Sequence, residues 1–199
     1  MLHEHIHPGV MRRLNVGDAE AFADHLLRLD PVSRQMRFEG ALSDDTIRNY
    51  ALGAFNRPGV HLGYVESGMI RAVGELVPEA VKGFSWPAEA EAAFSVEKPL
   101  QEGRIGTRLA ERIVGYARVS GIRRIVLNCL PQNVRMQRIA AHFGGELRCL
   151  EGEYQGIIEL GAPNLATCLR AGLHEGFDLV DRALSVADAM GPLPRRTPA

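Results

Sequence analysis

The sequence has few cysteines, almost no net charge and no long apolar run, and each shortage argues against a class of protein. Cys129, Cys149 and Cys168 include no C-x-x-C pair, which fits neither a disulfide framework nor a zinc site. The 23 Lys and Arg residues nearly balance 24 Asp and Glu residues, and the net charge of −1 gives no attraction to nucleic acid or an anionic membrane. No apolar run approaches the ~20 residues of a membrane helix, and the first residues contain no apolar signal core. We therefore expect a protein of the reducing cytoplasm that binds neither nucleic acid nor membrane.

What is present is ordinary globular composition. Of the 199 residues, 46% are hydrophobic and 24% are charged, which is typical of one folded domain. His3, His5 and His7 alternate near the start, but a loose segment binds metal weakly, so we predict no metal site. The expected organisation is a flexible arm over residues 1–9, a domain over residues 10–160, an amphipathic helix over residues 161–191 and a disordered tail over residues 192–199.

Hydrophobic periodicity and turn residues predict strands and helices in mixed order within the domain. Asp18, Ser43 and Asn133 are expected helix N-caps, and Ser67-Gly68 is expected to form a hairpin turn in which glycine supplies positive φ. The expected strands cover residues 10–15, 60–66, 69–77, 89–97, 124–130, 146–150 and 155–160, and the expected helices begin near residues 18, 43, 106 and 133. Strand pairs at both ends, with strand–helix–strand–helix–strand between them, predict an α/β (α+β) domain with a partly antiparallel sheet.

The C-terminal segment shows a different pattern. Leu165, Leu169, Leu173, Val180 and Leu184 trace one face of a long helix. Such an apolar face must be covered. The helix can pack on its own domain or contribute to a homodimer interface.

The segment Glu97–Leu109 joins a predicted strand to a predicted helix through glycines. Such a junction presents successive backbone N–H groups and the positive end of a helix dipole, which together bind phosphate or pyrophosphate. Gly103 and Gly106 allow close approach, and Arg104 and Arg108 can add charge beside the anion. The segment is not a Walker loop and does not match G-x-G-x-x-G, and taken alone it can also be only a turn.

Several features in order resemble the GCN5-related N-acetyltransferase (GNAT) family. They are a strand over residues 92–97, then Gln101-x-x-Arg104-x-Gly106 and a helix, then Gly121 before a strand, and Pro131-x-Asn133 before a helix that ends at Gly144. The resemblance covers residues 10–160 and implies a mixed, mostly antiparallel central sheet with flanking helices. It implies acetyl-CoA as acyl donor, with the pyrophosphate on backbone amides of the loop and the pantetheine arm on the strand edge. The cofactor-binding residues that it implies are Phe94, Ser95, Val96, Gln101, Glu102, Gly103, Arg104, Ile105, Gly106, Thr107 and Asn133.

The loop departs from the family pattern at one position. Where the family usually has its first motif glycine, this sequence has Arg104, and a glycine is displaced to Gly103. If the loop needs positive φ at residue 104, arginine there costs about 1 kcal/mol. Either the conformation shifts or cofactor binding is weakened.

The resemblance also implies catalytic roles. By its place in the strand before the loop, Glu91 matches the glutamate that many members use as general base, although it can equally be a solvated strand residue; Glu75 and Glu97 are weaker candidates. The usual acid is a tyrosine seven positions after the motif asparagine, and this sequence has Ala140 there. Tyr116 and Tyr154 are alternatives without positional support.

These observations leave three hypotheses. The first is an acetyl-CoA-dependent N-acetyltransferase that acts on a primary amine of a small molecule or a protein. The second is a CoA-binding or regulatory module that keeps the fold and has lost the chemistry, as Arg104 and Ala140 suggest. The third is a nucleotide-binding protein that uses the same loop. The segment Asp30–Ala41, with Arg34, Arg37 and Glu39, is expected to shape the acceptor site.

Overall fold

The computed structural model describes residues 9–78, 88–150 and 153–161. The elements in chain order are β1 (Val10–Arg13), η1 (Val16–Asp18), α1 (Ala19–Arg28), α2 (Pro31–Phe38), α3 (Asp44–Ala54), β2 (Val60–Glu66), β3 (Met69–Pro78), β4 (Glu89–Val96), η2 (Lys98–Leu100), α4 (Ile105–Val119), β5 (Arg124–Cys129), α5 (Val134–His142), β6 (Glu146–Leu150) and β7 (Glu153–Glu159). The predicted arm, the predicted C-terminal helix and the predicted tail fall almost entirely outside the described residues.

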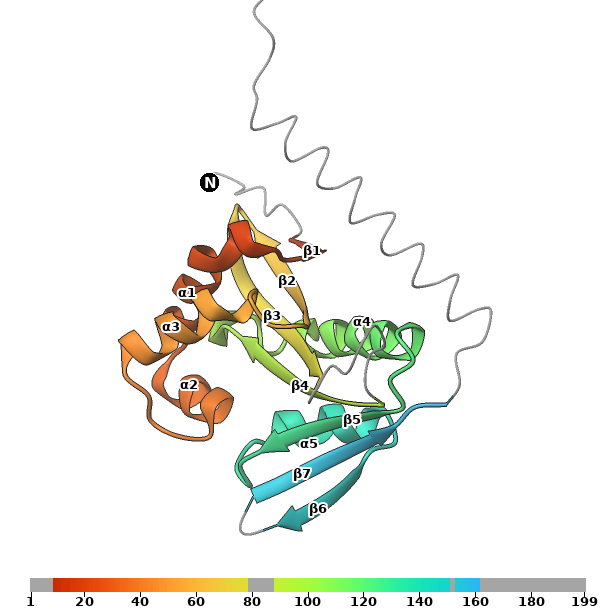
Figure 1. The fold of residues 1–199 in the computed structure, drawn as a ribbon. Coiled ribbons are helices and arrows are strands. Elements are labelled where there is room, and N and C mark those ends of the chain that lie inside the picture. Colours follow the sequence, from red (N-terminus) through yellow and green to blue (C-terminus); the bar gives the residue numbers. More distant parts are fainter. Residues whose placement is uncertain (1–8, 79–87, 151–152, 162–199) are drawn as a thin grey trace, which may run out of the picture.

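The strands form one sheet of seven in the order β1-β2-β3-β4-β5-β7-β6. Every neighbouring pair is antiparallel except β4 and β5, which are parallel. Figure 1 shows α1, α2 and α3 on one side of the sheet and α4 and α5 on the other. The mixed, mostly antiparallel sheet with flanking helices is confirmed.

Each face of the sheet has its own hydrophobic core. Leu109, Ile113 and Ala117 of α4 are buried in one cluster with residues of β2–β5 and α5, whereas Phe22, Leu26 and other residues of α1 pack with α3 on the opposite face. Strand residues alternate between the two clusters because successive side chains of a strand point to opposite faces. The structure therefore encloses β3 between two packed layers.

The boundaries follow the sequence prediction closely, with two corrections. Ser67 and Gly68 form the hairpin turn with φ values of 50° and 77°, and Ser43 and Asn133 cap their helices as expected. Asp18 makes no cap hydrogen bond to α1, because its carboxylate is bound by Arg12 and by the backbone N–H of Asn15.

The second correction is α2, which the sequence analysis left without secondary structure. Asp30 caps it through the N–H of Ser33, and Pro31 occupies its first turn. Helix α2 has no buried residue and is only eight residues long, so it offers few apolar positions from which a helix can be predicted. In the described part of the chain, no helix is both long enough and apolar enough to span a membrane.

Candidate active site

Strands β4 and β5 pair over only three residues and then diverge. The register joins Glu89, Ala90 and Glu91 to residues 124–126 of β5, whereas β3 pairs with β4 through to Val96. Figure 1 shows the two strands separating from this point toward α2. The edge of β4 from Ala92 to Val96 therefore has no β5 partner, and its backbone can pair with an extended ligand.

The loop after β4 adopts a left-handed conformation at its arginine. Arg104 has φ 59° and ψ 12°, which is the left-handed region, and it lies directly before α4. This conformation is the one that a glycine adopts at no steric cost. The predicted alternative of a shifted loop therefore does not occur, and Arg104 carries the strain of about 1 kcal/mol.

Two of the loop amides are used within the loop itself. The N–H of Gln101 donates to the carbonyl of Lys98 at 3.3 Å, and the N–H of Gly103 donates to the carbonyl of Leu100 at 3.1 Å. The other five have no acceptor among the described residues, and they belong to Glu102, Arg104, Ile105, Gly106 and Thr107. Free N–H groups at a helix N-terminus fit the pyrophosphate of a CoA ester.

Gly106 leaves space beside these amides. A Cβ atom there would lie 3.6 Å from Val96 and 3.7 Å from Ile139, which is ordinary contact, so the packing of the protein does not require glycine. Arg104 and Arg108 form no ion pair with another described residue, and both are exposed next to the free amides. The donor set, neutral N–H groups with two unpaired cations, suits a diphosphate.

Two predicted cofactor-binding side chains have partners inside the fold. The Gln101 amide nitrogen donates to the Ser33 hydroxyl at 2.9 Å and to the Val96 carbonyl at 3.0 Å, which ties α2 to the end of β4. The Asn133 side-chain oxygen accepts from the N–H of Met136 at 3.2 Å and caps α5. Its amide nitrogen has no partner among the described residues. These contacts leave Gln101 with a tethering role and Asn133 with a free donor.

The three candidate carboxylates differ sharply in their surroundings. Glu75, on β3, is 1% exposed and is bound by Arg37, by the Tyr50 hydroxyl at 2.9 Å and by His61 at 3.4 Å. Burial alone would raise the pKa of the Glu75 carboxyl, but the charge of Arg37 and the hydrogen bond from His61 lower it to about 2. A carboxylate held this firmly is a poor proton acceptor.

Glu97 is engaged in the same way. Arg71 donates to one carboxylate oxygen at 2.6 Å, and Arg28 donates to the other at 3.0 Å. Burial would raise the pKa of Glu97, but hydrogen bonds from His25 and Arg71 and the charge of Arg28 lower it to about 2. Glu97 therefore has a structural role, since it links α1 and β3 at the start of the loop.

Glu91 is exposed and forms no hydrogen bond or ion pair with another described residue. It is the last β4 residue that pairs with β5, so it lies where the two strands begin to diverge. By strand alternation it faces the same side as Ser95, whose hydroxyl contacts His25 of α1. Of the three carboxylates, Glu91 is the one that is free to accept a proton at the end of the open strand edge.

The position of the family tyrosine is filled by a buried small residue. Ala140 is 1% exposed, and a Cβ atom on Gly156 of β7 would lie 3.0 Å from the Ala140 Cβ. Tyr116 accepts a hydrogen bond from Arg13 at 2.7 Å at the β1 side of the sheet, away from the open strand edge. Tyr154, on β7, pairs with Cys129 at the end of β5 and packs on the α4–α5 core.

The segment expected to shape the acceptor site lies beside this gap. Its arginines are neutralised within the fold, because Arg34 pairs with Asp44 at 2.6 Å and Arg37 pairs with Glu75. Burial raises the pKa of the Cys129 thiol, and the negative charge of Glu39 raises it further.

The described residues hold no metal-binding cluster, and they include one contact that the sequence did not predict. In residues 9–78, 88–150 and 153–161, no three His, Cys, Asp or Glu side chains gather to hold a metal ion. The contact of His25 with Ser95 was not foreseen. The two residues are 70 positions apart, and neither lies in a motif, so no sequence signal connects them.

Comparison with known proteins agrees with this geometry. The GNAT domain of the PAT protein from S. lividans superimposes with a TM-score of 0.64 at 25% identity, over 76% of this chain and 90% of that domain. A putative acetyltransferase from Salmonella typhimurium, solved with its cofactor acetyl-CoA, superimposes with a TM-score of 0.56 at 14% identity, over 79% of this chain and 98% of that one.

Sequence comparison also finds a curated relative. No protein-family model matches the chain. An octanoyltransferase from Acidiphilium cryptum is 29% identical over 146 residues, which cover 66% of this chain. The chain spans 57% of the length of that curated relative.

Proposed function

We propose that this chain, whose fold is that of the GNAT acetyltransferases, transfers an acetyl group from acetyl-CoA directly to a primary amine, with Glu91 as general base. The observation that carries the proposal is the position of Glu91, whose carboxylate has no partner among the described residues, at the point where β4 and β5 diverge. The free loop amides lie at the other end of the same open strand edge. Between them, five residues of extended strand span roughly 17 Å, which suits an extended pantetheine arm.

Each part of this edge has a distinct task in the proposal. The N–H groups of Glu102 and residues 104–107, with the charges of Arg104 and Arg108, bind the diphosphate. The backbone groups of Phe94, Ser95 and Val96 that face away from β3 align the arm. Acetyl-CoA supplies the activated thioester at the far end of the edge, next to Glu91.

Glu91 then acts on the acceptor. An amine attacks a thioester only when neutral, and Glu91 removes its proton directly or through water. Unpaired N–H groups of β4 near residue 92 stabilise the negative charge that develops on the carbonyl oxygen. Thiolate is a fair leaving group, so transfer can proceed although Ala140 replaces the family acid.

CoA release over a panel of small amines and lysine peptides tests the activity. In Glu91→Gln, kcat should fall by about 10²-fold or more while KM for acetyl-CoA stays within a few-fold. Raising the pH should restore part of the loss, because the amine then loses its proton without help. Glu89→Gln is the matched control: it lies on the same strand face, its carboxylate is bound by Arg124 at 2.9 Å, and its removal should leave kcat within about twofold.

The alternative function is a CoA-binding module without turnover. The strained Arg104 and the filled Ala140 position are the observations that favour it. Saturable acetyl-CoA binding with no CoA release on the whole amine panel would select it. Thermal stabilisation by ATP or NAD that exceeds stabilisation by acetyl-CoA would instead select a nucleotide-binding protein. The CoA-release assay is repeated with octanoyl-CoA as the donor, because the curated relative is an octanoyltransferase.

A further inference from the structure

Helix α2 is held to the rest of the fold mainly by polar contacts. None of its residues is buried, and Phe38, its last residue, packs partly against the core of α1 and α3. Figure 1 shows β4 and β5 separating toward α2, so this helix borders the opening in which the proposed transfer takes place. Hydrogen bonds are directional, so a change in a few of them can move the helix without disturbing a packed core.

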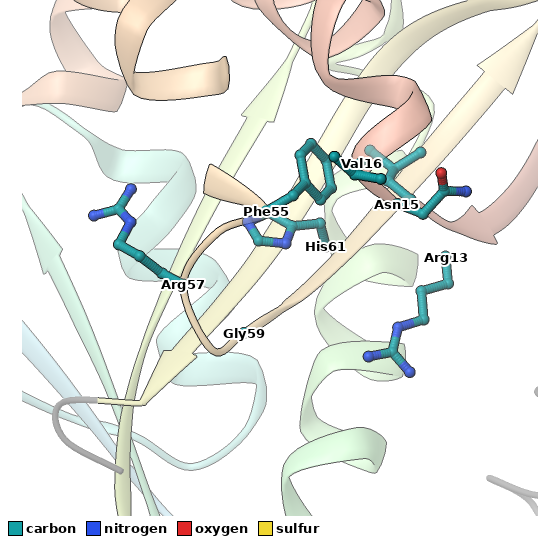
Figure 2. Close-up of a pocket in the computed structure, with 8 residues that line it drawn as sticks. Arg13, Asn15, Val16, Phe55, Arg57, Gly59 and His61 are labelled. Atoms are coloured by element: carbon teal, nitrogen blue, oxygen red, sulfur yellow. The ribbon is translucent and has the colours of Figure 1, made fainter. Parts of the chain in front are cut away.

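The C-terminal end of α2 is anchored firmly. Arg37 binds the buried Glu75 carboxylate and donates to the Tyr50 hydroxyl at 2.8 Å. His61 contacts the same carboxylate at 3.4 Å, and Figure 2 shows its ring beside that of Phe55, with the ring centres 4.7 Å apart. A buried and paired charge of this kind is costly to disturb. This end of α2 is therefore the fixed one.

The N-terminal end of α2 depends on the loop between β4 and α4. The Gln101 side-chain nitrogen donates one hydrogen to the Ser33 hydroxyl at 2.9 Å and the other to the Val96 carbonyl at 3.0 Å. Ser33 and Gln101 are 68 positions apart, so this bond joins two segments that no local structure connects. A single amide group thus links the helix to the open edge of β4.

The Ser33 hydroxyl is also part of the cap of α2. It donates to the Asp30 carboxylate at 2.6 Å, and the same carboxylate accepts from the N–H of Ser33 at 3.3 Å. Because its one hydrogen points at Asp30, the hydroxyl offers a lone pair to Gln101. The bond between Ser33 and Gln101 therefore has one arrangement, and a shift of Gln101 displaces the first turn of the helix.

Gln101 lies where the donor is proposed to bind. Its backbone N–H is used within the loop, but the next residue, Glu102, carries the first of the free amides assigned to the diphosphate. A ligand held on those amides fixes the backbone that carries the Gln101 side chain. What fixes Gln101 also fixes Ser33, and such a coupling acts equally in both directions.

We propose that Ser33 is a positioning residue, which couples the donor loop to α2 so that bound acetyl-CoA holds this helix in place for the acceptor. The inference rests on the proposed function, because it takes the free loop amides as the donor site. Ser33 touches neither substrate, and it acts through Gln101 on one side and through α2 on the other. Loss of its hydroxyl should therefore weaken acceptor binding and leave the donor site and the chemical step intact.

Amide resonances of the full chain in NMR, followed during titration with acetyl-CoA, test the coupling directly. In the unmodified chain the donor should shift resonances of the loop (residues 101–107) and of α2 (residues 32–38). In Ser33→Ala the loop shifts should persist, with acetyl-CoA affinity within about threefold, and the α2 shifts should fall by about half or more. Shifts in α2 that are absent from the unmodified chain, or equal in Ser33→Ala, overturn this proposal while the donor site stands. Absence of loop shifts overturns the donor site as well.

Thr46→Ala is the matched control. Thr46 follows the cap of α3 at the same spacing as Ser33 follows the cap of α2, and its hydroxyl bonds with the cap residue Ser43 at 2.8 Å. Both variants therefore lose a hydroxyl linked to a helix cap, and Ser33→Ala also loses the tie to Gln101. Thr46→Ala should retain the α2 shifts, and Ser33→Thr, which keeps a hydroxyl, should retain them too. Equal losses in Ser33→Ala and Thr46→Ala would assign the effect to helix capping and overturn the proposal.

Kinetics with an amine from the CoA-release panel give the second measurement. Ser33→Ala should raise KM for the amine about three- to tenfold, the range of a lost neutral hydrogen bond, and keep kcat and KM for acetyl-CoA within about threefold. Adding Ser33→Ala to Gln101→Ala should raise KM no further, because the bond is already lost. An unchanged KM for the amine in Ser33→Ala, or losses that add in the double variant, contradict the coupling. Where no amine on the panel reacts, the resonances of α2 still decide.

Discussion

The Nε2 atom of His25 on α1 lies 2.8 Å from the Oγ atom of Ser95 on β4. The Nδ1 atom of the same ring lies 3.4 Å from a carboxylate oxygen of Glu97. This order of serine, histidine and carboxylate is that of a nucleophilic triad, but His25 is 0% exposed and Ser95 is 4% exposed. No substrate can reach the hydroxyl. The three side chains instead fasten α1 to the strand that carries the proposed donor edge.

The His25 contact predicts a pH dependence of stability. Burial holds the pKa of His25 below its usual 6.5, so the folded chain keeps the ring neutral while the unfolded chain binds a proton below that pH. The free energy of unfolding should therefore fall as the pH drops below 6.5. Glu97, whose folded pKa is about 2 against an ordinary 4.5, should add a further loss as the pH falls below 4.5.

Urea unfolding at a series of pH values measures this effect. His25→Gln should be less stable at pH 8 by about 1–3 kcal/mol and should show a shallower decline between pH 7 and 5. His142→Gln is the control, because His142 is half exposed and should leave the slope as it is. Equal slopes in His25→Gln and the unmodified chain would show that His25 does not titrate on unfolding.

The conformation of Arg104 gives a second prediction. Arg104→Gly should raise the free energy of unfolding by about 1 kcal/mol, because glycine adopts φ 59° without a steric penalty. Arg104→Ala removes the same charge and keeps the strain, so the pair separates conformation from charge. Denaturant unfolding gives stability, and calorimetry gives acetyl-CoA affinity. A glycine variant no more stable than the alanine variant would show that residue 104 is not strained in solution.

Most of the fold is predicted by features of the sequence that involve only residues close together in the chain. The hairpin at Ser67-Gly68, the caps at Ser43 and Asn133 and the strand-to-helix loop each depend on a few neighbouring residues. The loop motif also offered a strained φ at residue 104 as one of two alternatives, and the structure has that φ. Helix α2 was missed because it is only eight residues long and buries no residue, so few apolar positions in the sequence indicate it.

The partners of the candidate site were less predictable for a different reason. Glu75, Glu91 and Glu97 are equivalent in the alternating pattern of strand residues. In the structure they differ because arginines bind Glu75 and Glu97. Arg37 comes from α2 and Arg28 from α1, which are 38 and 69 positions away from the carboxylates they bind. Such pairings depend on the packed tertiary structure, so the sequence offers all three carboxylates and cannot rank them by surroundings.

The buried pair of Arg37 and Glu75 predicts a large and non-additive effect on stability. Glu75→Gln leaves the Arg37 charge buried without a counterion and should cost about 3–5 kcal/mol. Arg37→Met and the double variant Arg37→Met with Glu75→Gln complete the cycle, and the double variant, which removes both charges, should lose clearly less stability than the sum of the two single losses. Urea unfolding of the single and double variants measures the coupling. Costs that simply add would show that the two charges do not interact.

The Ala140 position predicts that the general acid of the family cannot simply be restored. Ala140 is buried, and a Cβ atom on Gly156 of β7 would lie 3.0 Å from its Cβ atom, so α5 approaches β7 too closely for a large side chain. Ala140→Tyr should overpack this contact, lower the free energy of unfolding by about 1–3 kcal/mol or more and leave kcat no higher. Arg138→Tyr, at an exposed position of the same helix, should leave stability within about 0.5 kcal/mol. Circular dichroism during thermal unfolding, together with the CoA-release assay, compares the two. A stable Ala140→Tyr chain with raised kcat would contradict this prediction. It would mean that the tyrosine protonates the leaving thiolate and that the contact between α5 and β7 can accommodate a large side chain.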